Sequence, residues 1–252
     1  MSGVTLSIDT LTERDIAKAI DHSLLRPELD DAFVEDGCRL ALEYDVASVC
    51  VRPADVARAR AILAGSDVAV GTVIGFPHGN HRTETKVFEA HHALAEGATE
   101  LDMVIQIGAL KSGRDADVQA DIAAVVDVAH ASGAIVKVIF ENAYLTDDEK
   151  IRACRLSEAA GADFVKTSTG FAPGGATHDD LRLMRANTSP HIQVKAAGGV
   201  RTLDALLEVM ALGTTRIGAT ATKAIIDDFR ARKAGAAPVA TAAAAATTEG
   251  GY

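Results

Sequence analysis

The sequence contains little cysteine and no apolar run long enough to cross a lipid bilayer. Its three cysteines, Cys38, Cys50 and Cys154, are odd in number and lie far apart along the chain. They fit neither a disulfide framework nor a zinc site and are typical of a protein in a reducing compartment. The first residues also lack the basic segment and apolar run of a signal peptide, so we expect a cytoplasmic protein with no membrane partner.

Positive charge is scarce as well. The chain has 25 Lys and Arg against 35 Asp and Glu, which gives a formal net charge of -10 at pH 7. This balance argues against nucleic acid as a partner, because a phosphate backbone would be repelled. An anionic small molecule would need a local positive site, since the overall field is unfavourable. The eight histidines show no His-Glu-x-x-His spacing, so no metal site is expected from them.

Short β-type runs alternate with helical patterns along most of the chain. The expected strands are 21–25, 46–51, 68–76, 99–106, 134–140, the run that ends at Lys166, 191–195 and 215–218. The expected helices are 12–20, 31–44, one opened by Pro53, one ending at Glu96, 113–131, three capped by Thr146, Thr177 and Thr202, and one to about 232.

Eight strand–helix units of this size predict a (β/α)8 barrel preceded by a short N-terminal helix. A doubly wound open sheet is the alternative, but no Gly-x-Gly-x-x-Gly sequence follows the first strand. From Ala234 onward the composition becomes almost entirely Ala, Thr and Gly. We therefore predict one domain over residues 1–233 and a mobile tail over residues 234–252.

Four charged residues interrupt strands that should be almost wholly apolar. They are Asp102, Lys137, Lys166 and Lys195. Lys166 and Lys195 end consecutive predicted strands, where barrels carry their functional groups. Burial and a neighbouring ammonium both favour a neutral amine, so we expect the pKa of one lysine to fall toward neutrality. The alternative is a buried ion-pair network that serves packing only, although three cations around one anion would make a poor one.

Loops rich in threonine and glycine follow the last three predicted strands. Small residues with free backbone N–H groups can hold a phosphate, although each glycine pair alone could simply form a turn. An amine beside such a loop is consistent with covalent chemistry on a phosphorylated carbonyl compound, and the alternative is a lysine at a strand end whose ammonium reaches solvent. The candidate phosphate-binding residues are Thr169, Gly170, Gly174, Gly175, Gly198, Gly199, Gly218 and Thr220.

Several segments together resemble the deoxyribose-phosphate aldolases. The segment Val165-Lys-Thr-Ser-Thr-Gly-Phe171, followed by Gly174-Gly-Ala-Thr177, is similar to the Schiff-base segment of that family. The resemblance runs from about Ile16 to Phe229 with its motifs in order. The other matching segments are Gly75-Phe-Pro77, Glu100-Leu-Asp-Met-Val-Ile105, Val136-Lys-Val-Ile139 and Val194-Lys-Ala-Ala-Gly-Gly-Val-Arg-Thr202.

The resemblance implies a class I aldolase that needs neither metal nor cofactor. It would cleave 2-deoxy-D-ribose 5-phosphate reversibly to D-glyceraldehyde 3-phosphate and acetaldehyde, in deoxyribose phosphate catabolism. Lys166 matches the imine-forming lysine, Lys195 the second lysine that lowers its pKa, and Asp102 the carboxylate of the proton relay. Lys137 is expected in the same catalytic group. Some family members fold a C-terminal tyrosine over the site, which makes Tyr252 a further candidate, and a homodimer or homotetramer is expected.

The sequence also departs from the family pattern in three places. Asn80-His-Arg82 is more charged than expected, and Glu141-Asn142-Ala143 replaces a Glu-Thr-Gly segment. Thr220-Ala221 replaces a serine-containing phosphate turn. Two other function classes stay open: a different lysine-dependent aldolase, such as a transaldolase-like or fructose-bisphosphate-type enzyme, and a sugar-phosphate-binding protein without turnover.

Overall fold

The computed structural model describes residues 6–237. Eight parallel strands pair in chain order, and β8 pairs with β1 to close a barrel. The predicted (β/α)8 fold is therefore confirmed, and the open sheet is wrong. The strands are β1 (Ile20–Leu24), β2 (Ser48–Val51), β3 (Ala69–Ile74), β4 (Glu100–Val104), β5 (Ile135–Ile139), β6 (Phe164–Lys166), β7 (Gln193–Ala197) and β8 (Arg216–Ala219).

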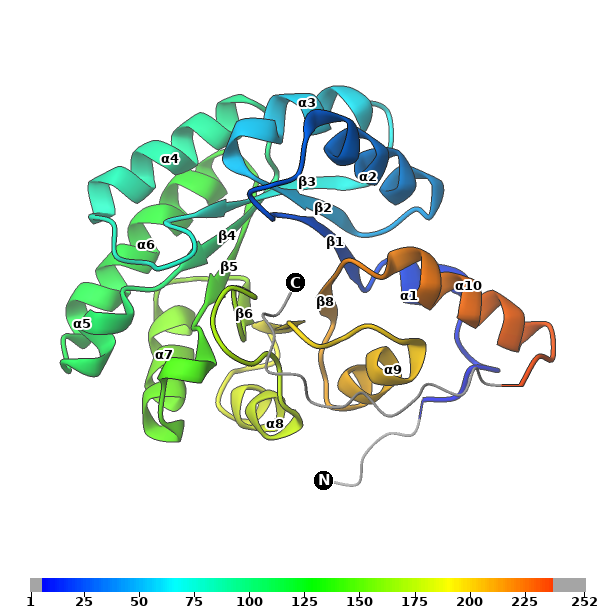
Figure 1. Cartoon of the computed structure of the whole chain (residues 1–252). Helices are drawn as coiled ribbons and strands as arrows, with labels where there is room; N and C mark the ends of the chain where they lie inside the picture. Colours follow the sequence, from blue (N-terminus) through cyan, green and yellow to red (C-terminus); the bar gives the residue numbers. More distant parts are fainter. Residues whose placement is uncertain (1–5, 238–252) are drawn as a thin grey trace.

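Helices surround the barrel on its outside (Figure 1). The expected threonine caps are confirmed, and Thr146 forms the expected capping box with Glu149. The helices are α1 (Glu13–Ala17), α2 (Asp31–Glu43), α3 (Val56–Ile62), α4 (Thr83–Ala95), α5 (Ile107–Lys111), α6 (Asp115–Ala131), α7 (Asp147–Ala159), α8 (His178–Ala186), α9 (Leu203–Ala211) and α10 (Thr222–Lys233), with short 3-10 turns η1 (Pro53–Asp55) and η2 (Asn142–Tyr144).

Most predicted boundaries shift by one or more residues, and two of the differences bear on the site. β4 ends at Val104, two residues before the predicted end, and the short helix α5, which was not predicted, follows it. β7 continues past Lys195 to Ala197, so Lys195 lies in the middle of its strand and not at the end. The strand register, and not the position of the strand end, decides which residues are neighbours, and Lys195 is directly paired with Lys166 on β6.

The apolar core lies between the strands and the helices, and the barrel interior is polar. Successive side chains of a strand point to opposite faces. On β4, Leu101 and Met103 belong to the main hydrophobic core, whereas Glu100 and Asp102 are buried charges. The helices thus cover the apolar outer face, and the closed lumen receives the charged side chains. No helix among residues 6–237 is long and apolar enough to span a membrane.

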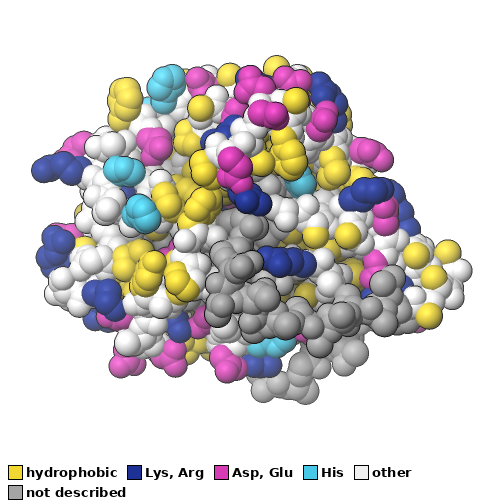
Figure 2. All heavy atoms as spheres, in the orientation of Figure 1, with side chains coloured by type: hydrophobic (Ala, Val, Ile, Leu, Met, Phe, Trp, Pro, Cys, Tyr) yellow, Lys and Arg dark blue, Asp and Glu magenta, His cyan; other side chains and the backbone are white. Residues whose placement is uncertain are grey.

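The surface carries charge of both signs. Among the described residues on the face drawn in Figure 2, acidic and basic side chains are interspersed.

Candidate active site

The carboxylate of Asp102 joins three lysines inside the barrel. Its Oδ2 atom lies 2.7 Å from Nζ of Lys166 and 2.7 Å from Nζ of Lys195. Its Oδ1 atom lies 2.9 Å from Nζ of Lys137. All four side chains are buried. The four charged residues singled out in the sequence therefore form one contiguous cluster.

The strand register explains why these residues meet. Asp102 on β4 is paired directly with Lys137 on β5, and Lys166 on β6 is paired with Lys195 on β7. Because all four side chains point into the lumen, four consecutive strands deliver their charged groups to one small volume. Pairing in the barrel brings the four strands together, and the alternation of side chains along each strand points these four residues into the lumen.

Three further charged residues complete the cluster, and the sequence analysis missed them. Asp21 Oδ2 lies 2.5 Å from Lys195 Nζ, and Glu100 Oε2 lies 2.5 Å from Lys137 Nζ. Arg216 donates to Asp21 and to Glu100, at 2.6 and 2.7 Å. The expectation of three cations around one anion is therefore wrong. The cluster holds four cations, namely three lysines and Arg216, against three carboxylates, so one positive charge is in excess.

A sequence signal for these residues existed. Glu100 precedes Asp102 by two positions, so it must face the same side of β4. Asp21 and Arg216 lie on β1 and β8, the two strands that meet only when the barrel closes. Strand parity applied to all eight strands would have placed each of the three in the lumen.

The electrostatics of the cluster differ from the sequence expectation. Burial alone would lower the pKa of Lys166, but the charge of Asp102 at 2.7 Å outweighs it, and the pKa is raised. Burial likewise opposes charge on Lys137, and Asp102, Asp21 and Glu100 together raise its pKa. Burial would raise the pKa of Asp102, yet the three lysines hold it well below its ordinary value. The pKa values of Lys166 and Lys137 are thus shifted in the direction opposite to the fall that the sequence analysis expected for one lysine.

An apolar wall lies beside the charged cluster. Leu25, Cys50 and Val73 form a small hydrophobic cluster of their own, with Phe76 packed against it. Burial raises the pKa of the Cys50 thiol to about 11, so this side chain is neutral at pH 7.

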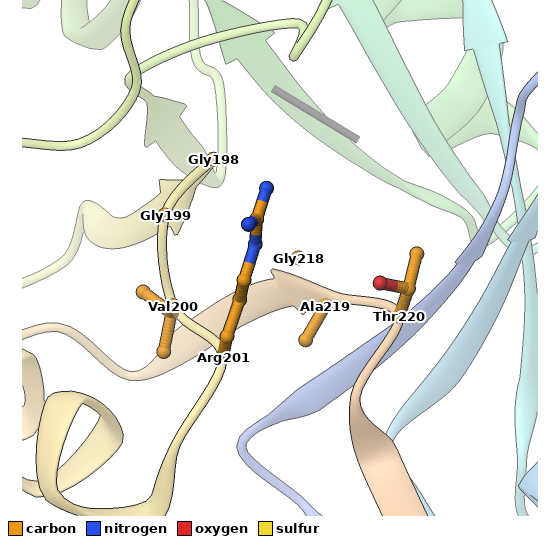
Figure 3. Close-up of a pocket in the computed structure, with 7 residues that line it drawn as sticks. All are labelled: Gly198, Gly199, Val200, Arg201, Gly218, Ala219 and Thr220. Atoms are coloured by element: carbon orange, nitrogen blue, oxygen red, sulfur yellow. The ribbon is translucent and has the colours of Figure 1, made fainter. Parts of the chain in front are cut away.

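Four of the predicted phosphate residues line one cavity at the ends of β7 and β8. Gly198, Gly199, Gly218 and Thr220 surround it, together with Arg201, which the sequence analysis did not single out (Figure 3). A methyl group on Gly218 would lie 3.7 Å from Cε of Lys195. The cavity is therefore adjacent to the lysine cluster, and a guanidinium stands at its edge.

The other predicted phosphate residues do not line this cavity. Gly175 packs against the backbone of Gly198, since a Cβ on Gly175 would lie 2.6 Å from it. The amide of Ala176 donates to the carbonyls of Ala197 and Gly198, at 3.0 and 3.1 Å. Gly174 and Gly175 thus belong to a segment that supports the loop after β7.

Thr169 and Gly170 belong to the turn after β6. The amide of Thr169 donates to the carboxylate of Glu141, at 3.2 and 3.3 Å to its two oxygens. Phe171 from the same turn packs edge-on against Phe76, with ring centroids 5.3 Å apart. Tyr252 lies outside the described residues, so its predicted place in the site stays a prediction.

Metal ligands are not gathered in the described part of the chain. Within residues 6–237, no group of three or more His, Cys, Asp or Glu side chains is placed to hold a metal ion. The three carboxylates of the lumen contact lysine and arginine.

Comparisons with known proteins agree with this geometry. The family described as DeoC/LacD family aldolase matches residues 15–237. A deoxyribose-phosphate aldolase of Bacillus cytotoxicus is 53% identical over 212 residues, which is 84% of this chain and 95% of the relative. One of Clostridium perfringens is 51% identical over 217 residues, 86% of this chain and 96% of the relative. The tetrameric deoxyribose phosphate aldolase structure from Aeropyrum pernix aligns with a TM-score of 0.81 at 30% identity, covering 88% of this chain and 93% of that one. The chain belongs to the DeoC/LacD family of aldolases.

Proposed function

We propose that this aldolase cleaves 2-deoxy-D-ribose 5-phosphate reversibly to D-glyceraldehyde 3-phosphate and acetaldehyde, through an imine on Lys166. The observation that carries the proposal is the single oxygen of Asp102 shared by Lys166 and Lys195, each 2.7 Å away. The names of the relatives support the substrate. Deoxyribose phosphate catabolism in the cytoplasm is the corresponding cellular role.

The first step moves a proton away from Lys166. Asp102 accepts it across 2.7 Å, and the free amine attacks the aldehyde carbon. This transfer is uphill, because the pKa of Lys166 is raised and that of Asp102 is lowered, so Asp102 holds the proton only in passing and delivers it to the hydroxyl that leaves as water. One ammonium and one aldehyde thereby become one protonated imine and one water. Lys195 stays hydrogen-bonded to Asp102, and its positive charge disfavours reprotonation of the Lys166 amine.

The second step breaks a carbon–carbon bond. The electron pair of the C2–C3 bond moves onto the protonated imine while the C3 hydroxyl gives its proton to Asp102. Glyceraldehyde 3-phosphate departs, and an enamine remains on Lys166. Protonation of C2 and hydrolysis of the imine then release acetaldehyde. The apolar wall of Cys50, Val73 and Leu25 accommodates the two-carbon unit.

The phosphate is assigned to the cavity after β7 and β8. Its backbone N–H groups and the guanidinium of Arg201 supply the local positive site that an acidic protein needs. Thr220 retains a hydroxyl where the family often has serine. Lys137 is assigned to holding Asp102 in place, because it contacts the oxygen that Lys166 and Lys195 leave free.

The decisive test is reduction of the imine. Borohydride with acetaldehyde should add an ethyl group to the peptide that carries Lys166, as read by peptide mass mapping. Label on Lys137 or Lys195 would overturn the assignment. Product analysis with the phosphorylated sugar separates this enzyme from other lysine-dependent aldolases, and absence of any adduct would indicate a binding protein.

Tyr252 and the oligomeric state complete the proposal. The C-terminal hydroxyl is assigned to proton transfer at the enamine carbon, as the family resemblance implies. Changing Tyr252 to Phe should reduce deuterium exchange into acetaldehyde while imine formation persists; unchanged exchange would exclude the role. A homo-oligomer is proposed because the Aeropyrum pernix relative is tetrameric, and sedimentation measures it.

A further inference from the structure

Glu141 is a buried carboxylate at the end of β5 that the mechanism above leaves unused. Its φ of 57° lies in the left-handed region, which is unfavourable for a residue with a side chain. Its side chain is buried. A strained, buried and charged residue at the barrel mouth persists only when its surroundings stabilise that arrangement.

The backbone fixes Glu141 beside Lys166. The amide of Phe140 donates to the carbonyl of Lys166 at 3.0 Å, and the amide of Asn142 donates to the carbonyl of Thr167 at 2.9 Å. Glu141 therefore sits between two hydrogen bonds to the segment that begins at the imine-forming lysine.

The carboxylate of Glu141 has Thr169 as its hydrogen-bond partner. It accepts from the backbone amide of Thr169 at 3.2 Å and also from the Thr169 hydroxyl. Within residues 6–237, no ion pair joins Glu141 to a cation within 4.0 Å. Burial raises the pKa of Glu141, and the hydrogen bonds from Thr169 oppose that rise. The more distant charges of Lys166 and His78 oppose it as well, so Thr169 is the hydrogen-bond partner of a carboxylate whose burial is costly.

That contact fixes which hydrogen bonds the Thr169 hydroxyl donates and which it accepts. A hydroxyl has one hydrogen to donate and two lone pairs to accept with. The hydrogen goes to Glu141, and one lone pair accepts from the amide of Phe171 at 3.0 Å. The remaining lone pair can only accept. Glu141 and Thr169 line a small cavity together with His78 and Tyr144, so the pair borders a space in which a ligand group fits.

We propose that Glu141 is a positioning residue that holds the hydrogen of the Thr169 hydroxyl, so that the Thr169 oxygen accepts a hydrogen bond from a hydroxyl of the sugar substrate and cannot donate one to it. This inference rests on the proposed function and identifies a determinant of substrate choice. A sugar hydroxyl is bound in one orientation, whereas acetaldehyde has no hydroxyl for this contact.

The test compares two substrates in Glu141→Gly. Glycine adopts a φ of 57° without strain, so the variant loses the carboxylate and keeps the backbone. We expect kcat/KM for the phosphorylated sugar to fall roughly 10- to 100-fold, as for a lost polar contact to substrate. Borohydride trapping of acetaldehyde on Lys166 should keep its wild-type yield. Thr169→Val should lose sugar cleavage in the same way, and adding Glu141→Gly to it should change little further.

The matched control is Glu149→Ala. Glu149 also accepts from the backbone amide of a threonine, Thr146 at 2.8 Å, but does so in the helix cap of α7. Glu149→Ala should change sugar cleavage and acetaldehyde trapping to the same extent. Equal losses on both substrates in Glu141→Gly, or no loss on either, would overturn the inference. Absence of imine in the wild type would overturn the proposed function instead. In that case, calorimetry of sugar-phosphate binding decides the inference. Binding must then weaken in Glu141→Gly and stay unchanged in Glu149→Ala.

Discussion

Lys166 in the lumen and Lys86 between α4 and α6 are both buried lysines, yet their pKa values are shifted in opposite directions. Burial lowers the pKa of Lys86, and Asp121 at 2.5 Å does not fully offset it. Lys166 also loses its water, but the charge of Asp102 raises its pKa. Among residues 6–237, each lysine has one carboxylate within 4.0 Å, so the difference lies in what surrounds the pair.

The Lys86 pair is completed by neutral groups. Lys86 donates to the carbonyl of Val104 at 2.8 Å, and Asp121 accepts from Thr83 at 2.8 Å and from Gln106 at 3.1 Å. This arrangement ties α4 and α6 to the end of β4. In the lumen the carboxylate is instead shared among three ammonium groups. Asp102, which contacts three ammonium groups, can exchange protons between them. Asp121 has one cation and neutral donors as partners, so its contacts connect helices and serve the fold.

The largest effect should come from removing one lysine or the other. Lys166→Met should abolish turnover and imine trapping while the protein stays folded, because it removes the nucleophile. Lys86→Met should keep the turnover number and lower the free energy of unfolding by about 3–5 kcal/mol, since Asp121 loses its cation. Denaturant unfolding and steady-state kinetics measure both. Loss of turnover in a folded Lys86→Met protein would contradict the comparison.

The carboxylates should separate in the same way. Asp102→Asn should reduce turnover by roughly two orders of magnitude or more in a folded protein, as for a lost proton-transfer group. Asp121→Asn should instead lower stability with turnover preserved. If Asp102→Asn kept its activity but lost its stability, the lumen cluster would be an ion-pair network for packing only.

Acid should distinguish the lumen from the outer face of the barrel. His22 on β1 contacts Thr222 of α10 at 2.8 Å, and burial lowers the pKa of His22 from 6.5 to about 4. Between these values the unfolded chain binds a proton that the folded chain does not, so stability falls as pH falls. The loss should reach about 3 kcal/mol by pH 4. The pKa values of Asp21 and Asp102 are lowered from 3.8, so the lumen contributes its loss only below about that pH.

The measurement is denaturant unfolding as a function of pH. His22→Gln should flatten the stability curve between pH 6.5 and 4, and His91→Gln, exposed on α4, serves as the control. A curve for His22→Gln parallel to that of the wild type would exclude His22 as the titrating group.

The smallest effect is expected from a substitution in the loop after β7, outside the charged cluster of the lumen. Gly199→Asp places a carboxylate at the cavity after β7, where a Cβ would meet no atom within 4 Å. The φ of 92° strains any residue other than glycine, so the result lies in the difference between two sugars measured on the same variant. We expect KM for the phosphorylated sugar to rise about tenfold through charge repulsion, equivalent to about 1.4 kcal/mol. KM for unphosphorylated deoxyribose should change much less. A parallel rise for both sugars would show that this loop does not bind the phosphate.

Much of the architecture was already predictable from the sequence. The alternation of β-type and helical runs predicted eight units, and threonines followed by acidic residues predicted the helix caps, because these signals depend only on neighbouring residues. The charged residues in apolar runs identified Asp102, Lys137, Lys166 and Lys195, since parallel strands rarely carry charge. Helix α5 was missed because it is only one turn long.

The protonation of the site was decided only by the tertiary structure. Asp21 and Arg216 are 195 positions apart and meet only because β8 pairs with β1. Their charges and that of Glu100 act on Lys137, whose pKa is raised. The pKa of Lys166 rises because Asp102 lies beside it across the lumen, where local reasoning expected a fall. Likewise, barrel closure separates Gly198, Gly199, Gly218 and Thr220, which line a cavity, from Gly175, which packs behind it. Electrostatic energies depend on distances through space, and a linear sequence does not contain those distances.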